Sequence, residues 1–239
     1  MKKIFLILSL LISVPSQSAN IGSIHSYVQD APKITKHDNL KSVVQYLIRP
    51  YRDDEEKALA ILTWIVLNID YDEYYYQKAD EDNKSKRDKS RYIPEQGDII
   101  ETRLGVCKDI AALYVEMLKM AKIDSKTIPG CITRNNNPIT CQENPHMWNA
   151  VWINNQWELV DPTYAMGQAS VLGNLGTKRA YDREVRKRTR PSSDIYKPRK
   201  NRSVDMTWFM TDPKIMEKDH HPNDKKWYLT KNKNRRNKD

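Results

Sequence analysis

Three residues in the middle of the chain have the types and the spacing of an acyl-transferring thiol enzyme. Cys107 lies in GVCKDIAALYVEML, His146 follows 39 residues later in HMWNAVWI, and Asp161 lies 15 residues further on in WELVDPTY. A thiol nucleophile needs a base that accepts its proton, and the base needs a group that orients it. A cysteine, a histidine and an aspartate meet these needs if the fold brings them together.

Cys107 is predicted to lie in the first turn of an amphipathic helix. Apolar side chains follow it with helical spacing, at Ile110, Ala111, Leu113, Tyr114, Met117, Leu118 and Ala121. The unpaired N–H groups and the positive dipole at a helix start favour a thiolate, and they can also stabilise an oxyanion beside the sulfur. The alternative is that Cys107, next to Val106, is a small buried hydrophobe.

Two ranges that follow have the pattern of a β-hairpin. Residues 146–153 and 156–161 are rich in Trp, Val, Ile and Leu, and Asn154-Asn155 stands between them. Asparagine tolerates positive φ, so the pair suits a two-residue turn.

This hairpin would bring His146 and Asp161 together. With a two-residue turn Trp148 opposes Asp161, which makes His146 and Asp161 diagonal neighbours on one face. The carboxylate would then orient the imidazole and leave its other ring nitrogen for Cys107. A slip of one residue would place the two on opposite faces. The alternative is an exposed strand histidine and an Asp-Pro strand end.

The strings GVCKDIA, HMWNAVWINNQWELVDPTY and KALAILTWIVLNIDYD resemble the transglutaminase-like superfamily. The resemblance implies a papain-like cysteine-protease fold and a catalytic triad of Cys107, His146 and Asp161. The trailing segment FMTDPKIMEKDHHPNDKKWYL is most similar to the kyphoscoliosis-peptidase-like branch. The resemblance covers roughly residues 40–230, except 165–205, where no family pattern is visible. It implies a protein or peptide substrate for a peptidase or a cross-linking acyltransferase, although some family members have no demonstrated activity.

The predicted fold is α+β, with N-terminal helices packed on an antiparallel sheet. Helices are expected over 40–51 and 54–68, the second capped at Asp53-Asp54. Strands are expected near 126–133, 138–142, 146–153, 156–161 and Trp227–Thr230. Trp64 on the second helix is expected in the core, with a place at the substrate cleft as the alternative, and Trp148 is a second cleft candidate. The second donor of an oxyanion hole is not assigned.

The first 19 residues have the pattern of a secretory signal peptide. Lys2 and Lys3 precede an apolar run from Ile4 to Val14, and small residues follow. The remaining chain is expected to form one domain over 20–230, to contain no transmembrane segment and to work in a periplasm or outside the cell. Its core is expected at about 40–165, with an excursion over 165–205, a trailing motif over 206–230 and a basic flexible tail over 231–239.

Three cysteines in an oxidising compartment leave one thiol over. Cys131 and Cys141 flank a polar turn and are candidates for a disulfide, which would keep Cys107 free. The alternative is that all three stay reduced. No metal or cofactor is expected, because no Cys or His pair has metal-ligand spacing except His220-His221, and adjacent histidines point in different directions.

The charge is concentrated late in the chain. Residues 176–239 carry 20 of the 40 Lys and Arg but only 9 of the 31 Asp and Glu. Such a region attracts anionic partners, which for a secreted protein are acidic envelope components rather than nucleic acid. The leading hypothesis is a hydrolytic, thioester-forming enzyme, and its alternatives are a cross-linking transglutaminase and a non-catalytic envelope-binding module. Residues 231–239 could also be a solubilising or disordered end.

Overall fold

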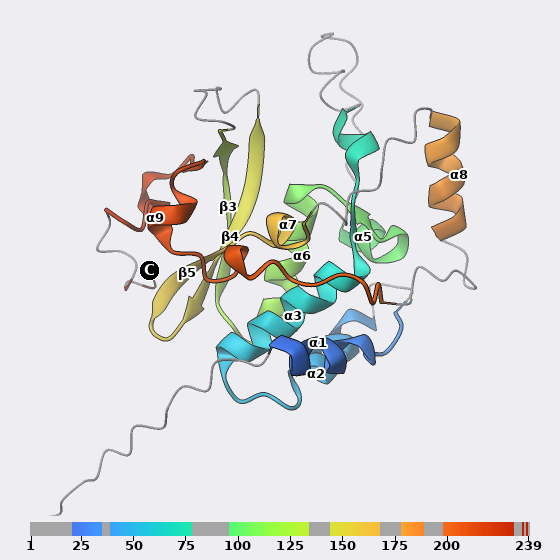
Figure 1. Ribbon diagram of the computed structural model, residues 1–239, viewed down its shortest axis with the longest axis horizontal. Coiled ribbons are helices and arrows are strands. Elements are labelled where there is room, and N and C mark those ends of the chain that lie inside the picture. The colour runs from blue at the N-terminus through green and yellow to red at the C-terminus, as the bar shows by residue number, and fades with distance from the viewer. Residues whose placement is uncertain are drawn as a thin grey trace, which may run out of the picture.

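The computed structural model describes residues 21–34, 39–77, 96–133, 144–167, 178–188 and 198–231, together with 236 and 238. Figure 1 shows an α+β arrangement in which helices lie against one side of an antiparallel sheet, as predicted. The helices are α1 Ile21–Gln29, α2 Leu40–Ile48, α3 Asp54–Asn68, α5 Gln96–Thr102, α6 Cys107–Met120, α7 Pro162–Ala165, α8 Lys178–Arg188 and α9 Pro213–Met216. No helix of the described ranges is long and apolar enough to cross a membrane.

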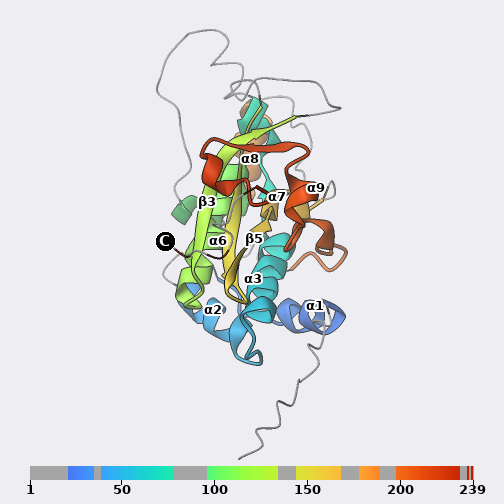
Figure 2. The ribbon, with the colours of Figure 1, turned by 90° about the vertical axis from the view of Figure 1, so that its left-hand side faces the viewer.

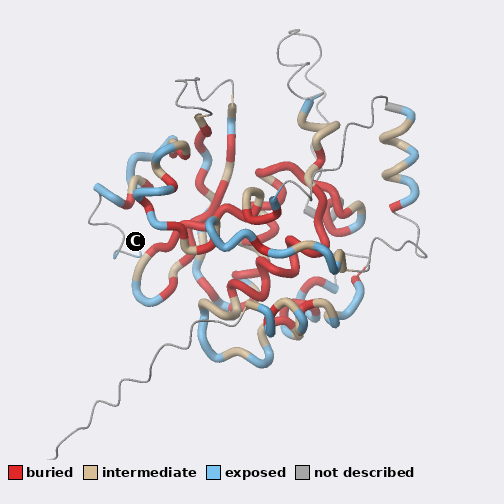
Figure 3. The backbone as a smooth tube through the Cα atoms, viewed as in Figure 1, coloured by how far each residue is buried: buried red, intermediate tan, exposed pale blue. Residues whose placement is uncertain are grey.

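Helix α3 is the centre of the helical layer. The Asp53 side chain accepts a hydrogen bond from the Glu55 N–H (2.8 Å) and so caps the start of the helix, as the sequence predicts. From Ala58 to Asn68 every residue of α3 is buried. Because this helix is apolar on all sides it must be surrounded, and Figure 3 shows it as an almost continuous buried segment.

The main sheet has four strands in the order β5-β4-β3-β6, and each neighbouring pair is antiparallel. Its strands are β3 Ser125–Ile132, β4 Pro145–Ile153, β5 Gln156–Val160 and β6 His220–Pro222. Asn154 and Asn155 form the predicted two-residue turn between β4 and β5, with φ of 52° and 61°. The ladder runs from Ile153–Gln156 to Asn149–Val160, which is the predicted register.

Each face of this sheet supports its own apolar cluster. One face contributes Val151, Ile153 and Val160 to the core that it shares with the helices. The opposite face carries Trp148, Trp157 and other apolar side chains, which Met216, Trp227 and Leu229 cover. The C-terminal segment around α9 is therefore a second cover for the sheet, and Figure 2 shows it on the side away from α6.

The strand predicted near Trp227–Thr230 is wrong. Residues Lys225–Trp227 form a 3-10 turn, which begins where the Asp224 side chain accepts a hydrogen bond from the Lys226 N–H. The apolar side chains of this stretch are buried against the sheet without pairing with it. The late strand is instead β6, His220–Pro222. The strand predicted over 138–142 lies outside the described residues.

A short parallel pair of strands leads into the helix that bears Cys107. Strand β1, Asp70–Tyr71, pairs with β2, Leu104–Gly105. A Cβ atom on Gly105 would lie 2.5 Å from the end of the Ile99 side chain and 3.2 Å from Asp109 Cβ, so a larger residue here would require these side chains to move. The pair fixes the path of the chain two residues before Cys107.

The basic excursion is anchored on a buried carboxylate. Asp70 accepts from Arg188 Nη2 (2.7 Å) and Arg199 Nη2 (2.8 Å), and it also pairs with Arg202. Burial alone would raise the pKa of Asp70, but the three guanidinium groups lower it below its usual value. The segment that the sequence suggested as an excursion is therefore tied to the end of α3 and the start of β1.

Candidate active site

Cys107 is the first residue of α6, as predicted. Val106 precedes the helix in an extended conformation, and its N–H donates to the Asp109 carboxylate (3.2 Å). Cys107 is a free cysteine and is 8 % exposed. Its sulfur therefore lies at the N-terminal end of a fourteen-residue helix, where backbone N–H groups have no partner within the helix.

His146 and Asp161 form a short hydrogen bond. His146 Nε2 lies 2.6 Å from Asp161 Oδ2, and both side chains are almost fully buried. The other oxygen, Asp161 Oδ1, accepts from the Tyr164 N–H (3.0 Å), because Asp161 also caps helix α7. The carboxylate is thus held on both oxygens, and it holds one nitrogen of the imidazole.

The Cys107 side chain interacts with the same imidazole. This interaction is among those that raise the pKa of His146. Since Nε2 faces Asp161, Nδ1 is the nitrogen left for the sulfur. The structure therefore brings the three sequence-predicted residues together.

The electrostatics of the pair favour the charged imidazole. Burial lowers the pKa of His146, but the Asp161 carboxylate and the Cys107 side chain outweigh it and raise the value to about 10. Burial likewise raises the pKa of Asp161, yet the charges and hydrogen bonds of His146 and His220 bring it well below its usual range. At neutral pH His146 is an imidazolium beside the sulfur of Cys107.

One side chain joins the strand of His146 to the helix of Cys107. Asn149 Nδ2 donates to the Ala111 carbonyl in α6 (3.0 Å) and to the Lys126 carbonyl in β3 (3.3 Å). Asn149 is fully buried. This polar tie fixes β4 relative to α6 and so fixes the imidazole relative to the sulfur.

A second histidine, which sequence reasoning did not assign to the site, lies on the same carboxylate. His220 Nε2 is 3.0 Å from Asp161 Oδ2, and His220 Nδ1 is 2.6 Å from Asp219 Oδ1. The trailing motif, in which His220 precedes the His-Pro pair of residues 221 and 222, was the available signal. It pointed to no role, because the pairing of β6 with β3 cannot be read locally.

Tyr71 is another residue that the sequence reading missed. It pairs with Gly105 across β1 and β2, and its pKa is raised by burial and then by the charge of Cys107, with Asp161 contributing less. Its phenol therefore stays protonated and can donate a hydrogen bond. The NIDYD string gave no sign of this, since the two-residue strand is too short for a pattern.

The two tryptophans proposed for the cleft are buried. Trp64 is 2 % exposed and lies under the guanidinium of Arg103, 5.1 Å from the ring centre. Trp148 is 1 % exposed, and its ring stacks at 6.0 Å from that of His146. Trp64 takes the core position that the sequence favoured, and Trp148 supports the imidazole from behind rather than offering a surface to substrate.

The remaining predicted residues concern disulfides and metals. Cys131 is disulfide-bonded, but Cys141 lies outside the described residues, so their pairing stays a prediction. Among the described residues His146, Asp161 and His220 offer possible metal-ligand atoms within 4.8 Å of one another. The same atoms are hydrogen-bonded to each other, which satisfies them without an ion.

Two known proteins are similar in sequence to most of this chain. Human kyphoscoliosis peptidase is 26 % identical over 223 residues, which cover 92 % of this chain and 28 % of that protein. The mouse kyphoscoliosis peptidase is 27 % identical over 205 residues, covering 84 % of this chain and 26 % of the relative. The chain thus spans about a quarter of the length of these relatives.

A solved structure and a family model also match parts of this chain. The crystal structure of a TGase matches with a TM-score of 0.41 and 13 % identity, over 65 % of this chain and 35 % of the other. The model of the transglutaminase-like superfamily matches residues 41–162, a range that includes Cys107, His146 and Asp161. The chain belongs to the transglutaminase-like superfamily.

Proposed function

We propose that this protein is a cysteine-dependent acyl-transfer enzyme that cleaves amide bonds of proteins or peptides by hydrolysis. The observation that carries this proposal is the 2.6 Å bond between His146 Nε2 and Asp161 Oδ2, on an imidazole that Cys107 also contacts. A nucleophile, its base and the orienting group of that base stand in the order that acyl transfer requires.

The chemistry proceeds in two steps. Because His146 already holds the proton at neutral pH, the Cys107 sulfur attacks the amide carbonyl carbon as a thiolate. His146 gives its proton to the leaving nitrogen as the C–N bond breaks, which leaves a thioester on Cys107. Water then attacks the thioester carbonyl and gives a proton to His146, and the sulfur leaves as a thiolate while the acid is released. An amine in place of water would make the reaction a transglutamination.

The oxyanion of each step needs donors near the sulfur. The N–H of Cys107, at the start of α6, is one donor of the proposed hole. We assign the second to the hydroxyl of Tyr71, which stays protonated because burial and the charge of Cys107 raise its pKa. Tyr71 lies on β1, which is paired with the strand that leads into α6.

The proposal is tested by peptide hydrolysis with the whole chain. A mixture of protein-derived peptides is incubated with the wild type and with Cys107→Ala, and the products are identified by mass spectrometry. New amino termini that appear only with the wild type support hydrolysis. A mass loss of ammonia with joined peptides would show amine transfer instead. Identical products from the wild type and from Cys107→Ala would contradict the proposal.

The site of action is a separate proposal. We infer from the leader pattern of residues 1–19 that the protein is exported. Expression of the whole chain in a bacterium, followed by fractionation and N-terminal sequencing, is expected to give a processed protein that starts after Ser18 or Ala19. An uncleaved chain retained in the cytoplasm would refute this inference.

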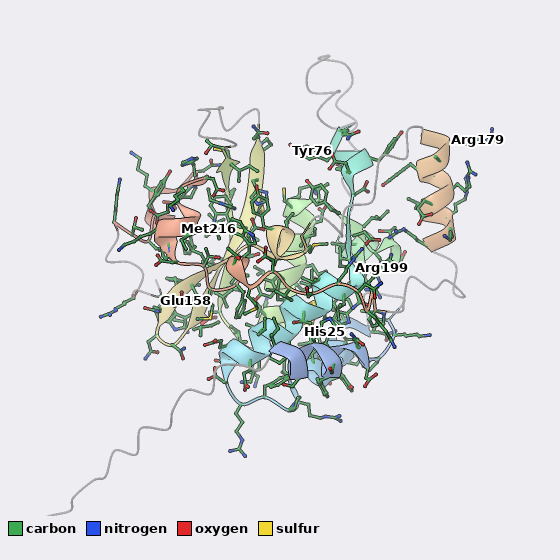
Figure 4. All side chains as sticks on the ribbon, in the orientation of Figure 1. His25, Tyr76, Glu158, Arg179, Arg199 and Met216 are labelled. Carbon is green, nitrogen blue, oxygen red and sulfur yellow. The ribbon has the colours of Figure 1, made fainter. Side chains whose placement is uncertain are left out.

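A specific observation favours an additional binding role for α8. Its exposed side chains Arg179, Arg183, Arg186 and Lys187 recur with the spacing of a single helical face. The other side of the helix is docked, because Tyr181 donates to Asp72 (2.7 Å) and stacks on Tyr74 at 4.6 Å. Figure 4 shows Arg179 pointing outward at one end of α8. We propose that this basic face binds an anionic polymer or membrane surface.

Binding by α8 is expected to depend on salt and not on the thiol. A variant with Arg179→Glu and Arg183→Glu should bind vesicles with 30 % anionic lipid at least tenfold more weakly than the wild type, as measured by co-sedimentation at about 0.1 M salt. Cys107→Ala should bind like the wild type. Equal binding by the double variant would contradict the role of this face.

A further inference from the structure

The buried His220 stands between two carboxylates. Its Nδ1 is 2.6 Å from Asp219 Oδ1, and its Nε2 is 3.0 Å from Asp161 Oδ2. The His220 side chain is fully buried, whereas that of Asp219 is 37 % exposed. Both nitrogens of one imidazole therefore face an oxygen of an acid.

The protonation of His220 follows from this geometry. An ionised carboxylate can only accept hydrogen bonds, so each ring nitrogen of His220 must carry a proton to bond its partner. An imidazole with both nitrogens protonated is a cation. Burial disfavours that cation, but the hydrogen bonds to Asp161 and Asp219 outweigh burial and raise the pKa of His220.

Sheet register places this cation on the face that carries His146. Gly130 in the middle of β3 pairs with His146 on one side and with Pro222 on the other. Since residues two apart share a face of a strand, His220 lies on the same face as His146. The Thr133 N–H also donates to the Asp219 carbonyl (2.8 Å), which secures the start of β6. The C-terminal segment thus delivers a charged group to the site from outside the region that matches the family model.

We propose that His220 is a positioning residue: a buried imidazolium that holds the Asp161 carboxylate in place and shares its negative charge with His146. This inference rests on the proposed function, because it concerns the machinery of that reaction. Asp161 Oδ2 accepts from both histidines, at 2.6 Å from His146 and 3.0 Å from His220. A carboxylate that serves two cations holds the proton of each less tightly than one that serves a single cation.

His220 affects the step in which His146 acts as an acid. His146 must release a proton to the leaving nitrogen, and an imidazolium bound too strongly by its carboxylate is a weak acid. His220 repels the positive charge of His146, since the two rings are 5.5 Å apart. It therefore keeps His146 acidic enough to act while Asp161 still orients it.

The surroundings of His220 supply few other charges. Of the described groups, the titratable ones that face its ring are Asp161 from the start of α7, Asp219 beside it, His146 from β4 and Tyr164 from α7. The other faces are covered by the rings of Trp148 and Trp208, at 5.0 Å and 5.4 Å. The balance of charge at Asp161 is thus set by the two histidines and by Asp219.

The test is a titration of the histidines in the whole chain without substrate. Nitrogen-15-labelled protein is followed by NMR from pH 5 to pH 12, and the five histidines are assigned by single substitution. In the wild type both ring nitrogens of His220 are expected to be protonated at pH 7. In His220→Gln, which keeps an N–H donor but no charge, the midpoint of His146 is expected to rise by about one unit, the order that a neighbouring charge produces at this separation.

Two further variants keep the test decisive. His221→Gln changes the adjacent, partly exposed histidine and is expected to leave His146 unchanged. Asp219→Asn keeps an acceptor oxygen but removes the negative charge, so it is expected to lower the midpoint of His220, and it serves if His220→Gln fails to fold. A neutral His220 at pH 7, or an unchanged His146 in both site variants, would overturn the inference.

A bound metal would also be visible. Signals of His146 and His220 that shift on addition of EDTA would mean that these residues hold an ion, and that result would overturn the inference too. Because no substrate is used, the titration separates this inference from the proposed function. If no peptide is hydrolysed but His220 is found to be protonated, the proposed enzyme activity is wrong. The assignment of a positive charge to His220 then still holds.

Discussion

Replacing Asp161 by Asn is expected to lower the rate of amide hydrolysis by about 10³- to 10⁴-fold, the loss typical when a catalytic histidine loses its orienting carboxylate. The amide can keep the hydrogen bond from the Tyr164 N–H, so the shape of the site is retained. It provides no charge, however, and burial then acts on His146 without its main opposing interaction. The pKa of His146 should fall below its ordinary value of about 6.5, and the imidazolium should be lost at pH 7.

A matched control exists in another helix cap. Asp212 caps α9 and accepts from the Lys214 N–H (2.8 Å), but it has no contact with a histidine. Asp212→Asn is therefore expected to keep the wild-type rate within about twofold, since an exposed cap contributes about 1 kcal/mol to stability and nothing to the chemistry. The measurement is the initial rate of peptide hydrolysis at pH 7 for the wild type and both variants. A loss below tenfold in Asp161→Asn, or equal losses in both variants, would contradict the role of the carboxylate.

Replacing Asp70 by Asn is expected to lower the free energy of unfolding by about 3–5 kcal/mol, the usual cost of removing one partner from a buried ion pair. Arg202, 9 % exposed at its side chain, would be left buried without another counterion among the described residues, and Arg188, 4 % exposed, would keep only Glu184. The end of α3, β1 and the segment after α8 meet at this point. Urea unfolding at pH 7 measures the loss.

The same variant gives a pH dependence with a defined sign. The pKa of Asp70 is lower in the folded protein than in the unfolded chain, so its contribution is present above about pH 4 and is lost as the pH falls through the folded value. The stability gap between the wild type and Asp70→Asn should therefore narrow below pH 4. Asp124→Asn is the control, because its pair with Lys238 is exposed and is worth at most about 1 kcal/mol. A gap that stays constant with pH would contradict the ion cluster.

The hairpin was the most predictable part of the site. Its register depended only on alternation in two strands and on the Asn154-Asn155 turn, both of which are local. The helix of Cys107 was predictable for the same reason, from apolar spacing after Gly105. These local signals placed His146 beside Asp161 and Cys107 at a helix start.

What escaped the sequence depends on contacts between distant segments. His220 reaches Asp161 because Ile132 pairs with it across β3 and β6, and a three-residue strand leaves no periodicity. The basic segment before residue 205 was interpreted as a region that attracts anionic partners, since nothing local reveals that Arg188 meets Asp70 over a hundred positions away. The apolar Trp227–Thr230 stretch was predicted as a strand because burial against a sheet and pairing within it leave the same apolar signal.

The most direct test of the central claim is the rate of iodoacetamide alkylation of Cys107 between pH 6 and pH 8.5, followed by peptide mapping in the wild type and in His146→Gln. An ordinary thiol with a pKa of about 8.5 loses about a hundredfold in rate over this range. Because His146 has a pKa of about 10 and stays positively charged beside the sulfur throughout, the wild-type rate should fall less steeply toward pH 6 than the rate of His146→Gln, and at pH 6 the wild type should react at least about tenfold faster. A steep dependence in the wild type, unaltered by the substitution, would contradict a histidine-activated thiolate and with it the proposed enzyme.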